Sequence, residues 1–325
     1  MKDLSARTPG VSKLGLMSLL IAAFFSVVSC KKESKTETEE KMPEEGKKEN
    51  VVEIVTNVMD FQSADTIPSG WITLRYVNKS SEAHFVLIDK YPEGKTEKDA
   101  IEEVNPVFQD AMHLINQGKQ EEGFAEFGKM PEWFSQVYQV GGVGLVSPKT
   151  SAETTLRLEP GEYIIECYVK MANGTFHTTM GMAKTIVASD QDSGNKPPEP
   201  TVGIKISTAE GIRYDKAIQK GKHVFAVHFE DQGPHEHFVG HDVNLVKLIE
   251  GSDLGVLEAW MNWVDPKGLI SPPPAGVIFM GGVNDMQAGG TGYFQAYLGP
   301  GNYAFISEVP NAMSKNMLKT FTVVE

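Results

Sequence analysis

Two groups of side chains in this 325-residue chain have the types needed for metal binding or redox chemistry. The first is a pair of cysteines, Cys30 and Cys167, which is too small a number for a disulfide scaffold. The second is a cluster of histidines in the C-terminal half, where His235, His237 and His241 form a weak candidate metal site. A Gly-Pro turn interrupts this acidic loop and no closed ligand set is evident. The sequence therefore favours a solvated loop, with the surface metal site as the alternative.

The N-terminal residues have the pattern of a secretion signal. Basic residues precede an apolar run from Leu14 to Val28, which is too short to be a comfortable membrane span. The sequence Val27-Val28-Ser29-Cys30 at its end resembles a bacterial lipobox, in which the cysteine is lipidated and becomes the first mature residue. We therefore predict a lipoprotein signal peptide over residues 1–29 and a lipidated Cys30. The alternative is a signal anchor with an incidental cysteine.

Residues 30–50 consist mainly of Lys, Glu, Ser and Thr. They cannot bury enough apolar surface to fold, so we predict a disordered tether. Acyl chains on Cys30 would bind membrane lipid without spanning the bilayer. The predicted location is the cell envelope, at the outer membrane in preference to the inner one, either periplasmic or surface-exposed. The formal net charge of −13, which becomes −15 without residues 1–29, argues against a nucleic-acid partner.

If Cys30 is acylated, Cys167 is the only free thiol, and it must survive outside the reducing cytosol. Such a thiol is either buried and inert or occupied by a ligand. The sequence contains no glycine-rich phosphate loop, no nucleophile elbow and no paired metal-site cysteines. These absences lead to the prediction that the protein is not an enzyme.

An internal repeat divides the chain into two units. The segment beginning at Leu158 recurs at Leu298, 140 positions later, and a Gly-Gly-Val tripeptide recurs at the same offset. Earlier in each unit the offset is 157, as between His84 and His241. The change of offset places 17 additional residues in the first unit. Two constant offsets indicate a tandem duplication with one insertion.

The domain boundaries follow from this duplication and from the local composition. At 325 residues, with 41% hydrophobic and 22% charged residues, the chain suits two globular domains. We predict domain 1 over residues 51–188 and domain 2 over residues 201–325. Residues 189–200, rich in Asp, Ser, Gly and Pro, are the predicted linker.

Apolar residues alternate with period two through both units, and Gly and Pro separate the alternating runs. The sequence therefore predicts an all-β fold of two tandem Greek-key β-sandwiches. The runs that carry this pattern are Ile72, Leu74 and Tyr76; Tyr163, Ile165, Cys167 and Val169; and Phe225, Val227 and Phe229.

The insertion, residues 96–130, has helical spacing instead. Thr96 is a candidate helix N-cap, and Asn105-Pro106 has the pattern of a second N-cap followed by its first helical residue. Gly118 is expected to end the run. We predict a helical flap on the first sandwich.

The first domain is similar to a cupredoxin of the plastocyanin and azurin type. Its segment from Trp71 to Ile88 resembles the part of that family in which a strand leads through an Asn-containing loop to a histidine. The segment from Pro160 to Ala188 resembles the second ligand loop, with a His-x4-Met spacing. The whole chain resembles tandem cupredoxin-like bacterial lipoproteins of the Bacteroidetes type.

This resemblance implies a mononuclear copper site in domain 1 with His84, Cys167, His177 and Met182 as ligands. Two neutral imidazoles, a thiolate and a weak axial thioether suit copper that cycles between its two oxidation states. The implied role is electron transfer or copper handling, with a redox or protein partner that the sequence does not identify. Domain 2 has Ser307 at the position of Cys167 and is expected to lack such a site.

The chain departs from the cupredoxin pattern in one respect. Nine residues separate Cys167 from His177, more than is usual in that family. Asn173-Gly174 within this stretch predicts a hairpin tip that returns His177 to Cys167. If the hairpin holds His177 away, the second hypothesis applies, a non-catalytic cupredoxin-like binding or scaffold module without metal.

Overall fold

The computed structural model describes residues 51–236, 240–263 and 265–325. The predicted signal peptide, the lipidation site and the tether lie outside these residues. In the part of the chain that is described, no helix has both the length and the apolar character needed to cross a bilayer.

Strands are the main secondary structure of the described residues, and the fifteen of them divide between the two halves of the chain. The first half contains β1 (Val51–Thr56), β2 (Thr66–Asn78), β3 (His84–Lys90), β4 (Tyr138–Val146), β5 (Ser151–Leu158), β6 (Gly161–Glu166) and β7 (Ala183–Asp192). The second half contains β8 (Val202–Ser207), β9 (Gly211–Tyr214), β10 (Gly221–Phe229), β11 (Val243–Leu248), β12 (Val277–Val283), β13 (Thr291–Leu298), β14 (Gly301–Ile306) and β15 (Leu318–Val323).

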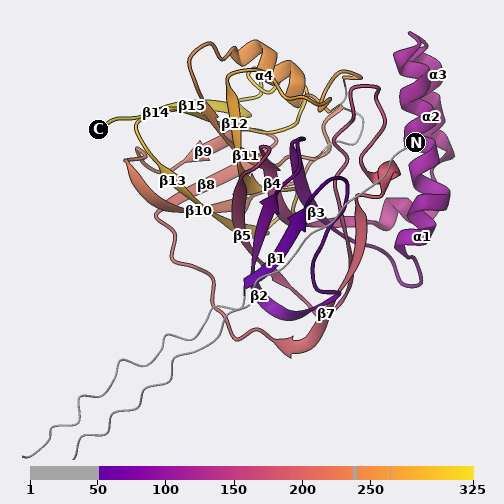
Figure 1. Ribbon diagram of the computed structural model, residues 1–325, viewed down its shortest axis with the longest axis horizontal. Coiled ribbons are helices and arrows are strands. Elements are labelled where there is room, and N and C mark those ends of the chain that lie inside the picture. The colour runs from indigo at the N-terminus through magenta and orange to yellow at the C-terminus, as the bar shows by residue number, and fades with distance from the viewer. Residues whose placement is uncertain (1–50, 237–239, 264) are drawn as a thin grey trace, which may run out of the picture. The chain divides into compact units, whose positions relative to one another are not determined.

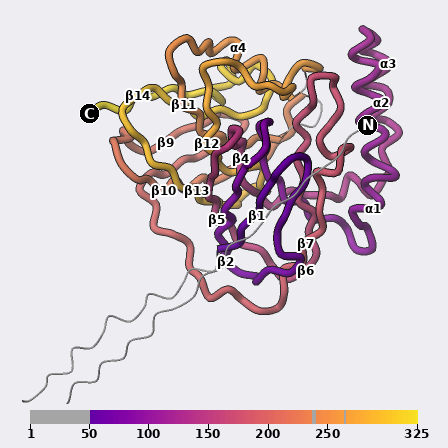
Figure 2. Tube along the Cα trace, viewed as in Figure 1, coloured from indigo at the N-terminus to yellow at the C-terminus, as the bar shows by residue number. Residues whose placement is uncertain are grey.

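The strands form two sheets that are joined where β2 pairs with β7, and each sheet runs through both halves. One has the order β1-β2-β5-β13-β10-β8-β9, and the other β7-β6-β3-β4-β12-β11-β14-β15. The halves meet where β5 pairs with β13 and β4 pairs with β12, both antiparallel. Figures 1 and 2 follow the chain from the indigo first half into the orange and yellow second half. The two sandwiches are therefore joined strand to strand.

The predicted all-β fold is confirmed, and so is the period-two pattern. Ile72, Leu74 and Tyr76 are fully buried on β2, as are Phe225 and Val227 on β10. One hydrophobic cluster contains residues of both halves. The 140-residue offset also appears in the strands, since β13 and β14 begin and end 140 positions after β5 and β6.

The end of the first half differs from the expected boundary. β7 continues to Asp192, so the first residues of the predicted linker are strand. Its edge is held by β2, with Ile67 beside Ala188 and Ser69 beside Asp192. The Ser193 N–H then donates to the Ser69 carbonyl (2.8 Å). Backbone pairing with β2 thus extends this segment despite its polar composition.

The insertion between β3 and β4 is helical, as predicted. It comprises α1 (Glu97–Asp99), a π-helical segment (Ala100–Val104), α2 (Asn105–Asn116), α3 (Gln120–Glu126) and two short 3-10 segments (Phe127–Lys129 and Glu132–Gln136). In Figure 1 α1, α2 and α3 stand at one flank of the sheets. The described part of the second half carries the α-helix α4 (Leu254–Met261), whose N-cap Asp253 accepts from two backbone N–H groups.

The helix signals in the insertion were partly right. Thr96 caps the first turn in a capping box with Asp99, and Gly118 ends α2 with φ +81°. Asn105 is not an N-cap, because its backbone is helical and its N–H donates to the carbonyl of Ala100. Proline has no N–H to donate to a preceding carbonyl. The wider π turn directly before Pro106 allows for this missing hydrogen bond, so the helix continues through Pro106.

Candidate metal centre

The first residue of β3, His84, is positioned by the loop that leads from β2. Asn78 ends β2, and its buried side-chain amide donates to the carbonyls of Glu82 (2.8 Å) and Val146 (2.9 Å). Its oxygen accepts from the Ser80 N–H (3.0 Å). One side chain therefore replaces the backbone pairing that this loop lacks, and it fixes the start of β3 and with it His84.

The stretch between Cys167 and His177 forms the predicted hairpin. Lys170 and Phe176 pair as an antiparallel bridge, and the Met171 N–H donates to the Thr175 carbonyl (2.8 Å). Gly174 adopts φ +83° at the tip, a conformation that glycine takes without steric cost. The His177 N–H then donates to the Val169 carbonyl (2.9 Å). The hairpin thus returns His177 to a position beside Cys167.

The helical insertion holds this hairpin in place. Met112 and Ile115 on α2 pack against Phe176, the residue before His177. The Gln109 side chain accepts from the Phe176 N–H (3.2 Å) and donates to the Gly174 carbonyl (3.4 Å). The insertion therefore contributes to the position of His177.

His84, Cys167 and His177 converge on one point. The Nδ1 atoms of the two histidines lie 3.1 Å apart, and the Cys167 Sγ lies 3.7 Å from Nδ1 of His84 and 3.8 Å from Nδ1 of His177. A triangle with these sides has a centre about 2.1 Å from each corner, which is the bond length of nitrogen ligands to first-row metals and within about 0.2 Å of that of sulfur ligands. A trigonal metal ion fits this triangle without movement of the three ligand atoms.

All three side chains are fully buried, and burial sets their protonation states. It lowers the pKa of His177 to about 4, and burial together with the neighbouring His177 lowers that of His84 to about 3. Burial raises the pKa of the Cys167 thiol to about 12. Both imidazoles are therefore neutral and able to ligate near pH 7. The thiol becomes a ligand only as a metal ion displaces its proton.

Met182 is fully buried next to this group. Its N–H donates to the His177 carbonyl (2.9 Å), and its carbonyl accepts from the Cys167 N–H (3.2 Å). Its backbone is therefore bonded to two of the three converging residues. These contacts suit the axial role that the cupredoxin resemblance gives to its sulfur.

The donor set fits copper. Two imidazoles and a thiolate in a trigonal arrangement are the ligands of electron-transfer copper sites. Among the described residues, this is the one group of three or more His, Cys, Asp or Glu side chains whose ligand atoms lie close enough to share an ion. Both Nε2 atoms are buried without a hydrogen-bond partner among these residues, so the Nδ1 atoms that face Cys167 are the engaged nitrogens. The predicted copper cofactor is thus supported.

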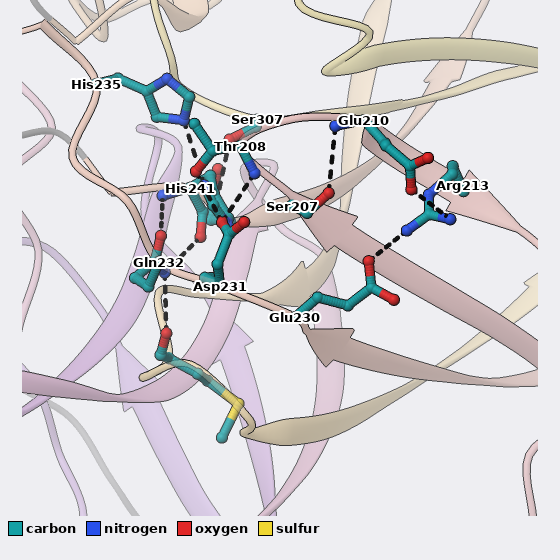
Figure 3. A network of polar contacts seen from close by, with 12 residues as sticks. Ser207, Thr208, Glu210, Arg213, Glu230, Asp231, Gln232, His235, His241 and Ser307 are labelled. Atoms are coloured by element: carbon teal, nitrogen blue, oxygen red, sulfur yellow. Dashed lines mark hydrogen bonds and ion pairs between the residues drawn. The ribbon is translucent and has the colours of Figure 1, made fainter.

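The alternative histidine site is arranged differently (Figure 3). His235 Nε2 lies 3.2 Å from His241 Nδ1, and the other ring nitrogen of His241 lies 2.9 Å from the Asp231 carbonyl. His241 is fully buried and stacks on Phe229 instead of facing solvent. Protein atoms thus engage both of its ring nitrogens. His237 lies outside the described residues.

At the position that matches Cys167, the second half has a serine in a similar hydrogen-bonded position. Ser307 is fully buried, and its hydroxyl accepts from the Asp242 N–H (3.1 Å). The Phe85 N–H makes the corresponding bond to Cys167 in the first half. The duplication thus places a hydroxyl where the first half has its sulfur ligand.

No protein-family model and no curated protein matches the chain. Several solved structures match it. Auracyanin A, a "blue" copper protein from Chloroflexus aurantiacus, is 17% identical with a TM-score of 0.26, over 43% of this chain and 98% of its own. A multicopper oxidase from Pseudomonas thermotolerans is 11% identical with a TM-score of 0.22, over 84% of this chain and 67% of its own. The copper nitrite reductase of Nitrosomonas europaea is 12% identical with a TM-score of 0.21, over 84% and 92%.

The prediction that the protein is not an enzyme is corrected by these matches. Two solved structures that align with 84% of the chain are named as an oxidase and a reductase. We therefore withdraw the exclusion of catalysis. Identities of 11% and 12% assign no reaction in its place.

A set of buried carboxyl groups near the metal centre was not predicted from the sequence. They are Asp89, Asp242, Asp285 and Glu308, together with the half-buried Glu166. Burial raises the pKa of Asp242 to about 6, and burial with the nearby Asp242 raises that of Asp285 to about 8. The available signal was an acid directly after apolar strand residues, as in Ile88-Asp89.

These carboxyl groups predict an unusual pH dependence of stability. Their pKa values are higher in the folded protein than in the unfolded chain, so the folded state binds more protons between about pH 4 and pH 8. Stability is therefore expected to fall as pH rises through this window, by up to about 1.4 kcal/mol per pH unit for each such carboxyl. Urea unfolding at pH 6.5 and pH 8 tests this, because the lowered pKa values of His84 and His177 oppose the trend below about pH 6.5, where they make stability rise with pH. Equal or greater stability at pH 8 would contradict it.

Proposed function

We propose that the first half of this chain binds a single copper ion through His84, Cys167 and His177, with Met182 as a weak axial ligand. The observation that carries the proposal is the triangle of two Nδ1 atoms and one Sγ atom, whose centre lies at metal–ligand bond length from all three. The role that this donor set supports best is electron transfer or copper handling.

Each group in the site has a definite task in this proposal. The bound copper supplies one-electron redox chemistry. The Cys167 sulfur favours the reduced ion, and the two imidazoles accept both oxidation states. The strands and the hairpin hold the ligand atoms at nearly fixed separations. This rigidity limits the rearrangement that accompanies electron transfer.

We also propose that the protein acts at the cell envelope, attached to membrane lipid through acylated Cys30 and separated from the bilayer by residues 31–50. The lipobox-like sequence before Cys30 supports this attachment. A radiolabelled fatty acid fed to cells that express the chain is expected to label it, and Cys30→Ala is expected to abolish the label. Equal labelling of both would contradict the anchor.

Copper titration of the purified protein tests the site itself. We expect binding of one equivalent of Cu(II) with an intense visible absorption from thiolate-to-copper charge transfer. No such absorption, with copper bound or not, would contradict the proposed thiolate ligand.

The Met182→Leu variant is expected to keep copper and its colour. An axial thioether is a long, weak ligand that tunes the reduction potential more than it holds the metal. Leucine has a similar volume, so the buried position should tolerate it at a cost below about 1.5 kcal/mol. Potentiometry should show a shifted reduction potential. An unchanged potential would indicate that the Met182 sulfur is not a ligand.

A further inference from the structure

A large pocket lies on the other side of the residues that carry the metal ligands. Its volume is about 890 Å³, within the range that accommodates small organic ligands. Glu166 and Tyr168, which flank Cys167, line it, and so do Phe176 and Thr178, which flank His177. The helical insertion supplies much of the rest of the wall.

The walls of the pocket are rich in aromatic rings. Phe108, Phe134 and Phe176 come from the insertion and the hairpin, and Trp263 comes from the loop after α4. Phe108 contacts each of the other three edge-on, with ring centres 5.9–6.1 Å apart. Such rings present both apolar surface and the negative π faces that attract cations.

The same pocket is lined by three buried acids, and the buried Lys170 is a cation near enough to Glu308 to favour its charged form. Asp89, Asp285 and Glu308 are at most 7% exposed, and no ion pair joins them to any side chain within the described part of the chain. Glu308 accepts from the Tyr168 hydroxyl (2.5 Å), and Asp89 accepts from Gln139 (3.2 Å). Buried carboxyl groups normally have a counter-charge, because an unpaired buried charge is costly.

Asp285 differs from the other two acids because one of its carboxyl oxygens, Oδ1, is buried without a hydrogen-bond partner among the described residues. This oxygen packs closely on Gly240, another lining residue, where an added Cβ atom would lie only 3.1 Å from it. The pocket wall therefore contains an acceptor oxygen with no donor among the described residues.

We propose that this pocket binds a small organic cation, an ammonium group attached to an aromatic or similarly apolar body. The ammonium lies against Asp285, and the body lies among the rings of Phe108, Phe134 and Trp263. Asp285, whose pKa burial raises to about 8, releases its proton to solvent as the cation binds. The ammonium then supplies a donor and a positive charge together, and the rings bind both its body and its charge. The proposal does not depend on copper and goes beyond the proposed function.

A metal ion is the competing occupant of an acidic pocket. The carboxyl oxygens of Asp89, Asp285 and Glu308 do not form a group close enough to share an ion, since the one such group among the described residues is the copper triangle. Separated carboxyl groups beside aromatic rings suit an extended organic cation better than a compact ion.

Calorimetric titration of the full chain with phenethylammonium, at neutral pH and with the copper site empty, tests the proposal. The neutral analogue 2-phenylethanol is the matched ligand. We expect the cation to bind at least tenfold more tightly than the alcohol. The Asp285→Asn substitution removes the charge and keeps the shape of the side chain. We expect it to weaken binding of the cation at least tenfold and to leave the affinity for the alcohol unchanged.

Glu121→Gln is the control variant, because it removes one negative charge from an exposed position on α3 of the same insertion. It should bind the cation as the unmodified protein does. Thermal melts establish that each variant is folded. If Asp285→Asn does not fold, Glu308→Gln replaces it, since glutamine can still accept from the Tyr168 hydroxyl.

Three outcomes would overturn the proposal. They are absence of phenethylammonium binding, equal binding of the cation and the alcohol, and unchanged cation binding in a folded Asp285 or Glu308 variant. Binding of Mg²⁺ or Zn²⁺ that is lost in Asp285→Asn, without binding of the amine, would also overturn it and would assign the pocket to a metal ion. Copper binding by the same samples reports separately on the proposed function.

Discussion

The Cys167→Ser variant is expected to lose the visible absorption of the copper-loaded protein and to bind copper more than about 100-fold more weakly. Serine lacks the polarizable sulfur of the copper–thiolate bond, and its hydroxyl stays protonated near neutral pH. The two imidazoles of His84 and His177 would remain as a weak site. Absorption spectra and competition titrations against a chelator measure both effects.

The second half of the chain supplies the control for this variant. Ser307 shows that serine fits the matching position, fully buried and accepting a bond from the Asp242 N–H. At position 167 the Phe85 N–H is available for the same bond. The metal-free variant should therefore melt close to the unmodified protein. Retained colour in a folded Cys167→Ser protein would place the chromophore elsewhere.

The Gly142→Ala variant is expected to destabilise the fold by about 3–5 kcal/mol. Gly142 lies on β4 with φ +143°, a conformation that residues with a side chain rarely adopt. An added Cβ atom would lie 1.9 Å from the carbonyl oxygen of Val86 on β3. The two paired strands would have to separate, and β3 begins with His84, so copper binding should weaken as well.

Two other glycines serve as comparisons for this prediction. Gly282 has the same environment in the second half, 1.9 Å from the Val243 carbonyl oxygen, so Gly282→Ala should cost a similar amount. Gly128, where an added Cβ atom meets nothing within 4 Å, should accept alanine without loss. Urea unfolding of the three variants measures the differences. A Gly142→Ala protein as stable as Gly128→Ala would contradict the argument.

The part of the fold that sequence reasoning predicted rests on local patterns. The alternation through Ile72, Leu74 and Tyr76 determines which face of β2 is buried, because successive strand residues point to opposite sides. The repeated Gly-Gly-Val tripeptide indicated the duplication. The structure shows why glycine is needed there, because β4 approaches β3 closely and β12 approaches β11 closely at this position. The Asn173-Gly174 hairpin was likewise predictable from its turn chemistry.

What the sequence did not predict depends on contacts between distant segments. The pairing of β4 with β12 and of β5 with β13 joins the halves, and no local pattern specifies it. The carboxyl groups of Asp89, Asp285 and Glu308 lie far apart in the sequence and meet only in the folded pocket. Asn105 was misassigned because an Asn-Pro pair has the same local appearance at a helix start and after a π turn.

X-ray absorption spectroscopy of the copper-loaded protein tests the central claim most directly, because it reports the atoms bound to the metal. The triangle of His84, Cys167 and His177 predicts one sulfur neighbour at about 2.1–2.3 Å and two imidazole nitrogens at about 2.0 Å, with the sulfur signal lost in Cys167→Ser. A copper shell of nitrogen and oxygen alone in the unmodified protein would contradict the account.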